Sequence, residues 1–286
     1  MRVATFNING IRAAQRRGFE DWLGQRDCDV VALQELRCPA DAVPDGVFAD
    51  YHLTYDPGTI PGRNGVAVLT RRPPTAIRMW ASAPPRAREL RPFALEGRYV
   101  EVDLADAPVT IANLYLPKGG LPAHLQDPRR MREAPDGGVK HARKMRFLAG
   151  FARHVTDARR AAAREGREFL LLGDLNVAHT RHDVANWRHN QSSEGFLPEE
   201  RAWLDAVVGP RRLVDVVRRL HPDRDGSYSW WSWMGQAFAK DAGWRIDYHL
   251  ATPRLARAAT SAGTDRDPAP DARISDHAPV VVDYDL

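Results

Sequence analysis

The sequence predicts a single α/β domain of many short strands with a few helices between them. Short apolar runs that end on Gly or on a polar residue recur along the chain, as in 29–35 and 169–172, and they are typical of buried strands. One long helical pattern covers 139–164. No linker rich in Pro, Gly and Ser divides the 286 residues and no repeat of fixed period occurs, so we expect one domain over 1–286.

The expected strands are spread along the whole chain. They are 3–8, 29–35, 65–70, 99–104, 109–116, 169–172, 228–233, 245–251 and 278–284. A short helix is expected over 19–23, and another from Leu197, where a Pro and two acidic residues suit a helix N-terminus. The segment 122–138 is rich in Pro, Gly and charge, and loops of this length are usually functional or mobile.

Composition narrows the class of protein. Hydrophobic residues make up 43% and charged residues 27%, which is ordinary for a globular chain. No apolar run approaches the roughly 18 residues of a membrane helix, and the first residues enter a strand pattern that leaves no room for a signal peptide. We therefore expect a cytoplasmic protein with no membrane partner. Nothing marks a self-complementary surface, so we expect a monomer.

The cysteine count and the net charge bear on the cellular compartment and on the kind of partner. Cys28 and Cys38 agree with a reducing compartment and cannot form a metal cage by themselves. The formal net charge of +4 permits a polyanionic partner. Nearly all of the 41 basic residues are Arg, which coding bias alone would explain, so we do not count this excess as evidence for nucleic acid.

The stretch 169–179 carries the strongest chemical signal. A buried strand ends at Gly173 and is followed by Asp174, Asn176 and His179. Asp174 and Asn176 are two positions apart, so both side chains point to one side of an extended backbone. An acid beside an amide suits a site that orients water and holds an anion. Taken alone, a capped strand end with an Asx turn is the simpler explanation.

Polar side chains at other strand ends favour the functional interpretation. The residues at or near the ends of predicted strands are Asn7, Glu35, Tyr115, Asp174, Asn176, Asp247, Asp276 and His277. Asp247 follows Trp244, Arg245 and Ile246, and Asp276 and His277 come just before the last strand. In two sheets of neighbouring strands these ends would meet at one rim. The four carboxylates among them would be costly to gather without a divalent cation. Oxygen ligands with few His and no Cys favour Mg²⁺ or Mn²⁺ over Zn²⁺.

Ser275-Asp276-His277 allows two interpretations, a loop cap or a reactive group. With Asp247 available to orient it, His277 is better interpreted as a phosphate contact or a proton-transfer group. No Ser or Cys stands in a nucleophile elbow, and there is no P-loop or GxGxxG sequence. Covalent acyl transfer and nucleotide-fuelled or dinucleotide chemistry therefore have no support.

Six segments together resemble exonuclease III and the related abasic-site DNA endonucleases, within the endonuclease/exonuclease/phosphatase superfamily. They are Thr5 to Arg12 (TFNINGIR), Leu33 to Glu35 (LQE), Gly173 to His179 (GDLNVAH), Gly195 to Arg201 (GFLPEER), Gly243 to Tyr248 (GWRIDY) and Ser275 to Val280 (SDHAPV). The match runs in order from residue 2 to about 282. The LQE and SDH motifs alone indicate only the superfamily, whereas FLPEER and GWRIDY indicate the DNA-repair branch.

The resemblance implies a four-layer α-β-β-α sandwich of two mostly antiparallel sheets flanked by helices. It implies Mg²⁺-dependent hydrolysis of DNA phosphodiesters, as 3′→5′ exonuclease on duplex DNA and as endonuclease 5′ to abasic sites. By the resemblance, Glu35 is the principal metal ligand, with Asn9 and Asp276 near the metal. Asp174 orients or deprotonates water, Asn7 and Asn176 hold phosphate oxygens, Asp247 fixes His277 on the scissile phosphate, and Tyr115 contacts the phosphate or assists the leaving oxygen.

The aromatic stretch 228–234 has two possible uses. About half of its rings are expected to be core between the sheets. The resemblance assigns Trp230, Trp244 and Ile246 to an apolar pocket for a sugar without a base, which would select abasic DNA by shape.

Basic residues around the expected rim are candidates for contacts with the DNA backbone, although for any one of them a solvated surface position is the simpler interpretation. They are Arg12, Arg17, Arg98, Lys118, Arg129, Arg130, Arg132, Lys140, Arg143, Lys144 and Arg146. Two departures from the family stand out. Leu36 and Arg37 follow Glu35 where many members have Thr and Lys, and the loop after Pro117 runs to Gly138. That loop leaves open the balance between exonuclease and endonuclease.

Two rival functions remain open at this stage. A lipid phosphoesterase would keep the chemistry of the superfamily, but the FLPEER and GWRIDY segments and the lack of a membrane-binding helix weigh against it. A DNA-binding protein without catalysis is the weakest alternative, because every candidate catalytic residue is present.

Overall fold

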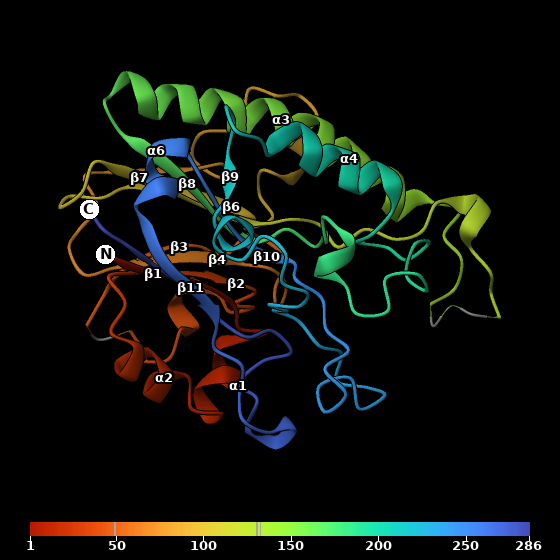
Figure 1. Cartoon of the computed structure of the whole chain (residues 1–286). Helices are drawn as coiled ribbons and strands as arrows, with labels where there is room; N and C mark the ends of the chain where they lie inside the picture. Colours follow the sequence, from red (N-terminus) through yellow and green to blue (C-terminus); the bar gives the residue numbers. More distant parts are fainter. Residues whose placement is uncertain (49, 130, 132) are drawn as a thin grey trace.

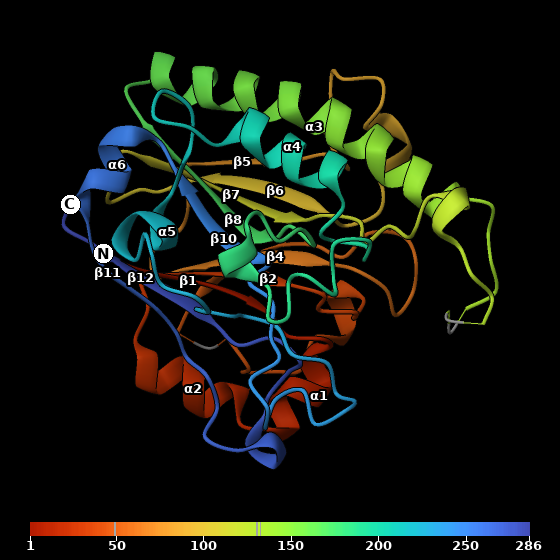
Figure 2. The ribbon, with the colours of Figure 1, turned by 45° about the vertical axis from the view of Figure 1, so that its right-hand side comes forward.

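The computed structural model of the chain describes every residue except 49, 130 and 132. The described residues form two six-stranded sheets packed face to face, with helices on both outer faces (Figures 1 and 2). Helices α3 and α4 lie over one sheet, and α1 and α2 lie under the other. The predicted four-layer α-β-β-α sandwich is therefore confirmed.

The two sheets draw strands from all parts of the chain. The first has the order β11 (Ala259–Thr264), β12 (Val280–Tyr284), β1 (Arg2–Asn7), β2 (Val30–Gln34), β4 (Val66–Thr70), β3 (His52–Asp56). The second has the order β5 (Ala76–Met79), β6 (Tyr99–Asp103), β7 (Val109–Tyr115), β8 (Glu168–Asp174), β10 (Asp247–Ala251), β9 (Val214–Asp215). The helices are α1 (Ile11–Arg16), α2 (Phe19–Arg26), α3 (Val139–Arg164), α4 (Pro198–Val207), α5 (Val216–Leu220) and α6 (Pro253–Ala258).

Each sheet is mostly antiparallel, as predicted. The pairs β1–β2 and β7–β8 are parallel, and the other strand pairs of the described residues are antiparallel. In a parallel pair the two strands end at the same edge, and in an antiparallel pair one strand ends where the other begins. Tyr115 therefore lies opposite Asp174, and Asp174 opposite Asp247, at one edge of the second sheet.

A buried polar contact joins the two sheets just below that edge. Gln34 of β2 donates from Nε2 to Asn113 Oδ1 of β7 at 2.8 Å, and Asn113 Nδ2 donates to the carbonyls of Leu33 and Ala67. Neither side chain has any exposed surface. Because buried amides without partners are costly, this contact favours one register between β2 and β7.

Several predicted boundaries differ from the structure, and one predicted strand is wrong. The helix expected over 139–164 is found at those bounds, whereas each predicted strand with a counterpart differs from it by one or two residues at an end. The segment 228–233 is not a strand: Trp230 forms only isolated bridges with Trp244 and His277. Its bulky rings suggested strand propensity, but Ser229 N and Trp230 N both bond to the carbonyl of Trp244, so the segment has no regular ladder.

Other elements were missed because their sequences carry little periodic signal. β11, with the sequence ATSAGT, consists of small residues and is largely exposed, and α1 and α5 have only six and five residues. No helix among the described residues has the length and apolar character needed to cross a membrane.

Candidate active site

Polar side chains from both sheets meet at the edge where β1, β7 and β8 end and β10 begins. Asn7 is the last residue of β1, and its amide lies between two carboxylates: Nδ2 donates to Glu35 Oε1 at 2.9 Å and to Asp174 Oδ2 at 3.0 Å. Asn7 is fully buried, and Asp174 is 1% exposed. Asn7 ends β1, Glu35 follows β2 and Asp174 ends β8, so these three predicted strand ends do meet at one edge.

Glu35 has a strained backbone and a cationic neighbour. Its φ of 55° lies in the left-handed region, which non-glycine residues seldom adopt outside functional sites and turns. One carboxylate oxygen accepts from Asn7 and the other is bonded by the guanidinium of Arg37. Arg37 stands where many members of the resembled family have Lys, and its guanidinium contacts Glu35 itself.

Asp276 forms the opposite side of the site. Asn9, also at a positive φ, donates from Nδ2 to Asp276 Oδ1 at 2.7 Å, and Trp230 Nε1 donates to Asp276 Oδ2 at 3.1 Å. The backbone N–H of Asn9 donates to Asn7 Oδ1 at 3.1 Å. The three residues predicted near a metal, Glu35, Asn9 and Asp276, are thus connected through Asn7.

Asp174 and Asn176 lie together, but not in the way that their spacing predicted. The strand ends at Asp174, and Asn176 has left-handed backbone with φ 48°, so the two side chains meet across a turn. The carboxylate accepts from Asn176 N at 2.8 Å and from Asn176 Nδ2 at 3.2 Å. The Asx-turn alternative is therefore correct in its geometry, and it coexists with the clustering of site residues around Asp174.

His277 lies between two buried carboxylates. Its Nδ1 is 2.8 Å from Asp247 Oδ2, and its Nε2 is 3.8 Å from Asp174 Oδ2. Burial alone lowers the pKa of His277, but the Asp247 carboxylate, with Asp174 and Asp276, raises it to about 10. The imidazole therefore carries a positive charge at neutral pH, which suits a contact with an anion.

The pKa of the Asp174 carboxyl is also raised, but for a carboxyl this favours the neutral form. Burial raises its pKa to about 7, and the nearby charges of Asp247 and Glu35 act in the same direction, while His277 opposes them. A carboxylate whose pKa lies near neutral pH can accept a proton from water more readily than an ordinary Asp.

Tyr115 completes the rim at the end of β7. Burial, together with the neighbouring Glu35 and Asp174 charges, raises the pKa of its phenol well above the usual value, so it stays a neutral donor. Arg98, predicted as a DNA contact, is only 8% exposed. It bonds Glu96 Oε2 at 2.7 Å and the carbonyl of Tyr115 at 3.2 Å, and it lies 5.2 Å from the Tyr115 ring.

The donor chemistry of this edge fits a hard divalent cation. Glu35, Asp174, Asp247 and Asp276 bring four carboxylates to it, along with amide oxygens and without a thiol. Among the described residues, Asp247 Oδ1 is a buried oxygen without a hydrogen-bond partner. Among the residues that the structure describes, one group of acidic and His side chains has ligand atoms close enough to share an ion: Asp174, Asp247 and His277.

An apolar cluster lies beside the carboxylates. Trp230 and Trp244 meet edge to face with their centroids 6.4 Å apart, and Ile246 packs with them. Trp231 is buried, at 2% exposed, whereas Trp233 is 47% exposed. The three residues predicted for a sugar pocket are therefore neighbours. Trp231 is buried against Phe238 and Ala278 in a separate small cluster and Trp233 is exposed, so neither ring is core between the sheets as expected.

The predicted basic contacts fall into different environments. Arg12 and Lys118 are exposed, and Lys118 lies 3.1 Å from Glu194. A groove of about 590 Å³ begins beside Pro117 and is bordered by Lys118, Lys140, Arg143 and residues of the loop to Asp136. Lys144 has no exposed surface, so its prediction as a DNA contact is wrong. Arg130 and Arg132 lie outside the described residues.

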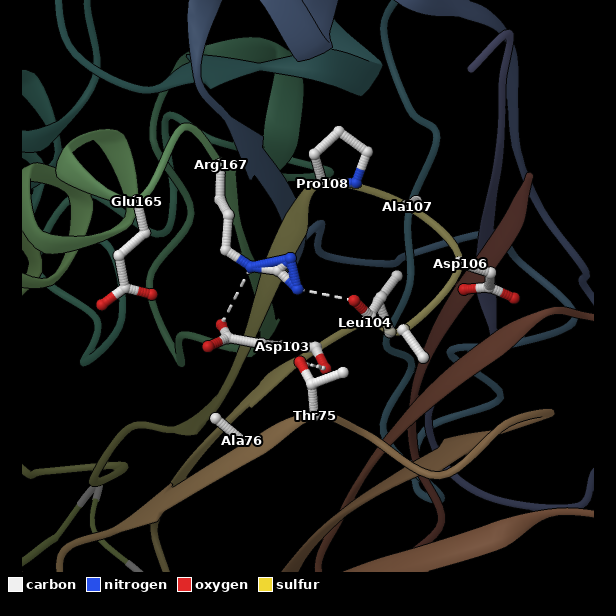
Figure 3. A pocket seen from close by; sticks show the side chains of 10 residues that line it. Thr75, Ala76, Asp103, Leu104, Asp106, Ala107, Pro108, Glu165 and Arg167 are labelled. Carbon is white, nitrogen blue, oxygen red and sulfur yellow. Dashed lines mark hydrogen bonds and ion pairs between the residues drawn. The ribbon is translucent and has the colours of Figure 1, made fainter.

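A hollow separate from the groove beside Pro117 lies at the far end of β7 from the candidate active site. Figure 3 shows it, about 600 Å³, between Thr75, the turn 103–108 and the end of α3. It borders Pro108, before the start of β7, whereas the site lies at the other end of that strand. Its Arg167 already bonds the carbonyl of Leu104 and pairs with Asp103 at 3.6 Å, so this hollow offers no free cation and no reactive pair.

Sequence reasoning missed the supports beneath the site. Arg245, at 1% exposed, is bound by Asp183 and Asp215, and it stands between Trp244 and Ile246 in the chain. Lys144 pairs with Glu200 in the interior. The positions of Arg245 and Glu200 inside the GWRIDY and FLPEER segments were visible signals, but their partners are far away in sequence.

Sequence comparisons match most of the chain to known proteins. A sequence model described as the endonuclease/exonuclease/phosphatase family matches residues 4–277. A DNA-(apurinic or apyrimidinic site) endonuclease of Dictyostelium discoideum is 27% identical over 287 residues, covering all of this chain and 71% of the relative. An exodeoxyribonuclease of Bacillus subtilis is 27% identical over 281 residues, covering 98% of both chains.

Solved structures show the same fold. The 3′-5′ exonuclease NExo of Neisseria meningitidis superposes with a TM-score of 0.80 at 25% identity, and an AP endonuclease of Archaeoglobus fulgidus with a TM-score of 0.81 at 24%. Each comparison covers the whole of both chains. The predicted class, a hydrolytic nuclease of DNA repair, agrees with the names of these relatives.

Proposed function

Since the chain belongs to the endonuclease/exonuclease/phosphatase family, we propose that it is a metal-dependent DNA-repair nuclease. Its substrates are duplex DNA, which it shortens from the 3′ end, and DNA with abasic sites, which it cuts on the 5′ side. The observation that carries the proposal is the arrangement around Asp174: a buried carboxylate within reach of a charged His277, with Asn7 and Asn176 beside it.

Each side chain has a role that its environment supports. Asp174 takes a proton from the attacking water, because its raised pKa makes it a base suited to neutral pH. The imidazolium of His277, oriented by Asp247, binds a non-bridging phosphate oxygen and stabilises the charge of the transition state. The amides of Asn7 and Asn176 are neutral groups that hold phosphate oxygens without repelling the anionic substrate.

Tyr115 lies opposite Asp174 across the pair β7–β8. Its phenol is a neutral donor placed near Glu35 and Asp174, and we assign it to the phosphate or to the leaving 3′ oxygen. Arg98 supports it from below, through the Tyr115 carbonyl and the face of the ring. This support explains how Arg98 contributes without being exposed, and its direct contact with DNA stays a prediction.

Glu35 is the proposed principal metal ligand, with Asp276 and Asn9 beside it. A bound Mg²⁺, or Mn²⁺ in its place, would supply positive charge for the phosphate oxygens as negative charge develops on them. We favour this donor set on the resemblance to the family, and a cation there would replace hydrogen bonds that Glu35 accepts from Asn7 and Arg37. Asp174, Asp247 and His277 are the alternative set, in which Asp247 Oδ1 has no hydrogen-bond partner. Titration of Mn²⁺ by calorimetry separates the two sets: Glu35→Gln should weaken binding at least tenfold, and Asp247→Asn should change it little.

Selectivity for abasic DNA is assigned to Trp230, Trp244 and Ile246. They form an apolar patch next to Asp276, since Trp230 bonds that carboxylate directly. A flipped sugar without a base would fit against the rings, whereas an attached base would collide with them. Arg12 and Lys118 would contact the DNA backbone, and the protein would act as a cytoplasmic monomer.

The test is cleavage of a labelled duplex that carries one abasic-site analogue, beside the intact duplex, in Mg²⁺ and in EDTA. One cut 5′ to the analogue, absent in EDTA and in Asp174→Asn, is the expected result. Asp157→Asn, which removes an exposed carboxylate of α3, is the matched control and should cut normally. Survival of both substrates in Mg²⁺ and Mn²⁺ would refute the proposal, and a phosphoinositide or sphingomyelin substrate would then be tested.

A further inference from the structure

One cation of α3 is completely buried close to the candidate active site. Lys144 Nζ lies 2.6 Å from Glu200 Oε1, and neither side chain has exposed surface. The same Nζ donates to the backbone carbonyl of Asn176 at 2.9 Å. A buried ammonium therefore connects α3, α4 and the turn that follows Asp174.

The carbonyl of Asn176 depends on an outside donor. Because Asn176 has left-handed backbone after the end of β8, the strand ladder does not serve its oxygen. On another side the turn is crowded by Gly195, where an added Cβ would lie 3.1 Å from this oxygen. A buried carbonyl without a partner is costly, and a charged donor is the stronger kind of partner.

Glu200 serves two purposes at once. Its Oε1 compensates the charge of Lys144, and its Oε2 accepts from the N–H of Leu197 at 3.0 Å, which caps α4. Gly119 closes over the lysine stem, because a Cβ there would come within 2.5 Å of Lys144 Cδ. The loop after Tyr115 therefore depends on the same side chain as the turn at Asn176.

We propose that Lys144 is a positioning residue for the nuclease reaction and that Glu200 is its counter-ion. The pair holds the Asn176 turn so that the amide of Asn176 keeps its contacts with Asp174 Oδ2 at 3.2 Å and with the Leu116 carbonyl at 2.9 Å. The reaction in question is the proposed cleavage of DNA, and this inference rests on that proposed function.

Stability and positioning can be separated at this pair. Removing one partner of a buried ion pair leaves an uncompensated charge and destabilises strongly, whereas replacing both by neutral groups is often tolerated. Lys144→Met with Glu200→Gln removes both charges and keeps the α4 cap, because glutamine still has an oxygen for Leu197 N. The double variant lacks only the donor to Asn176. Glu200→Gln alone keeps that donor.

The experiment compares the two variants with wild type and with Arg153→Met, which removes an exposed cation of α3 that pairs with Glu89. The double variant should cut the abasic-site duplex with kcat lowered by about 10- to 100-fold, since small misplacements near reacting groups cost that much. Its KM should stay close to that of wild type. Glu200→Gln leaves Lys144 without its counter-ion and should lower the free energy of unfolding, whereas Arg153→Met should retain kcat within about threefold.

Amide hydrogen exchange supplies a readout that does not depend on cleavage. The amides of 176–178 should exchange faster in the double variant, while those of β7 and β10 stay protected. Wild-type kcat in the double variant, or unchanged exchange at 176–178, would overturn the inference. A wild-type protein that cuts no DNA would defeat the proposed function alone, and the exchange result would still decide whether Lys144 positions the turn.

Discussion

The buried network around Arg245 allows a prediction whose size follows from the structure. Asp183 has no exposed surface, and its Oδ1 accepts from Arg245 Nε at 2.7 Å and from Arg218. Its Oδ2 accepts from the backbone and the hydroxyl of Thr180 at 2.8 and 2.9 Å. Asp183→Asn removes the negative charge. It also replaces one carboxylate oxygen by an NH₂ group, which must face the donors of either Arg245 and Arg218 or Thr180.

The expected cost is large for a single substitution. Breaking a buried ion pair by altering one partner costs about 3–5 kcal/mol in the free energy of unfolding. For a chain of 286 residues, with an unfolding entropy of about 2.1 cal/mol/K per residue, this corresponds to a melting temperature lower by roughly 5–8 °C. Asp225→Asn, in which the altered carboxylate is 82% exposed and pairs with His182, should change stability by less than about 1 kcal/mol.

The pH dependence checks the cause of the effect. Burial alone raises the pKa of Asp183, but the charges of Arg245 and Arg218 outweigh it and lower the pKa well below the ordinary value of 3.8. A carboxyl whose pKa is lowered by folding stabilises the protein above its unfolded pKa, and this contribution is lost as the pH falls toward the folded pKa. The difference between wild type and Asp183→Asn should therefore be full above about pH 5 and shrink below about pH 4.

Urea unfolding followed by tryptophan fluorescence, between pH 3.5 and 8, measures this difference. A loss under about 1 kcal/mol at pH 7, or a loss that does not shrink in acid, would refute the assignment of a paired buried charge. Because Arg245 stands between Trp244 and Ile246, the variant should also incise abasic DNA less well when assayed below its melting temperature.

Three further predictions concern single residues. Asp174→Asn should lower single-turnover cleavage by about 10²- to 10⁴-fold with DNA affinity retained, and a fall in affinity alone would contradict its role as a base. Burial lowers the pKa of His249 to about 4, so stability should be lost as the pH falls from about 6.5 to 4, by up to ~3 kcal/mol; His249→Gln should abolish this loss, and an equal acid loss in wild type and variant would count against it. Arg12→Ala should weaken binding to all DNA sequences alike and reduce the slope of log affinity against log salt by about one, whereas an unchanged slope would place Arg12 outside the DNA interface.

Local sequence carried most of the information about which residues form the candidate site. Asn7 and Asp174 were found because each stands at or just after the end of a predicted strand. Asp247 was found near the start of another, and it is the first residue of β10, which runs antiparallel to β8 and therefore begins at the same edge. The 139–164 pattern located α3 because a long helix repeats its signal many times. Elements that are short or weakly apolar, such as α5 and β11, show no periodic hydrophobic pattern, so the sequence did not predict them.

Long-range partners were beyond the reach of sequence patterns. Lys144 looked like one of several surface cations, and its burial comes from Glu200, 56 residues away. Arg245 meets Asp183 across 62 residues, and Asn7 meets Asp174 across 167. The sequence near each of these residues does not indicate its partner, because the pairs form only when the sheets and helices pack together.

The sequence by itself determined the kinds of groups that this protein brings to its site: carboxylates, amides, one imidazole and a cluster of tryptophans, each tied to a strand end or to the segment beside it. The tertiary structure alone decided what those groups do to one another. Packing places His277 between two carboxylates, where its pKa is about 10, and buries Asp174, so that its pKa is about 7. Such shifts arise from burial and neighbouring charge, and both exist only after the chain has folded.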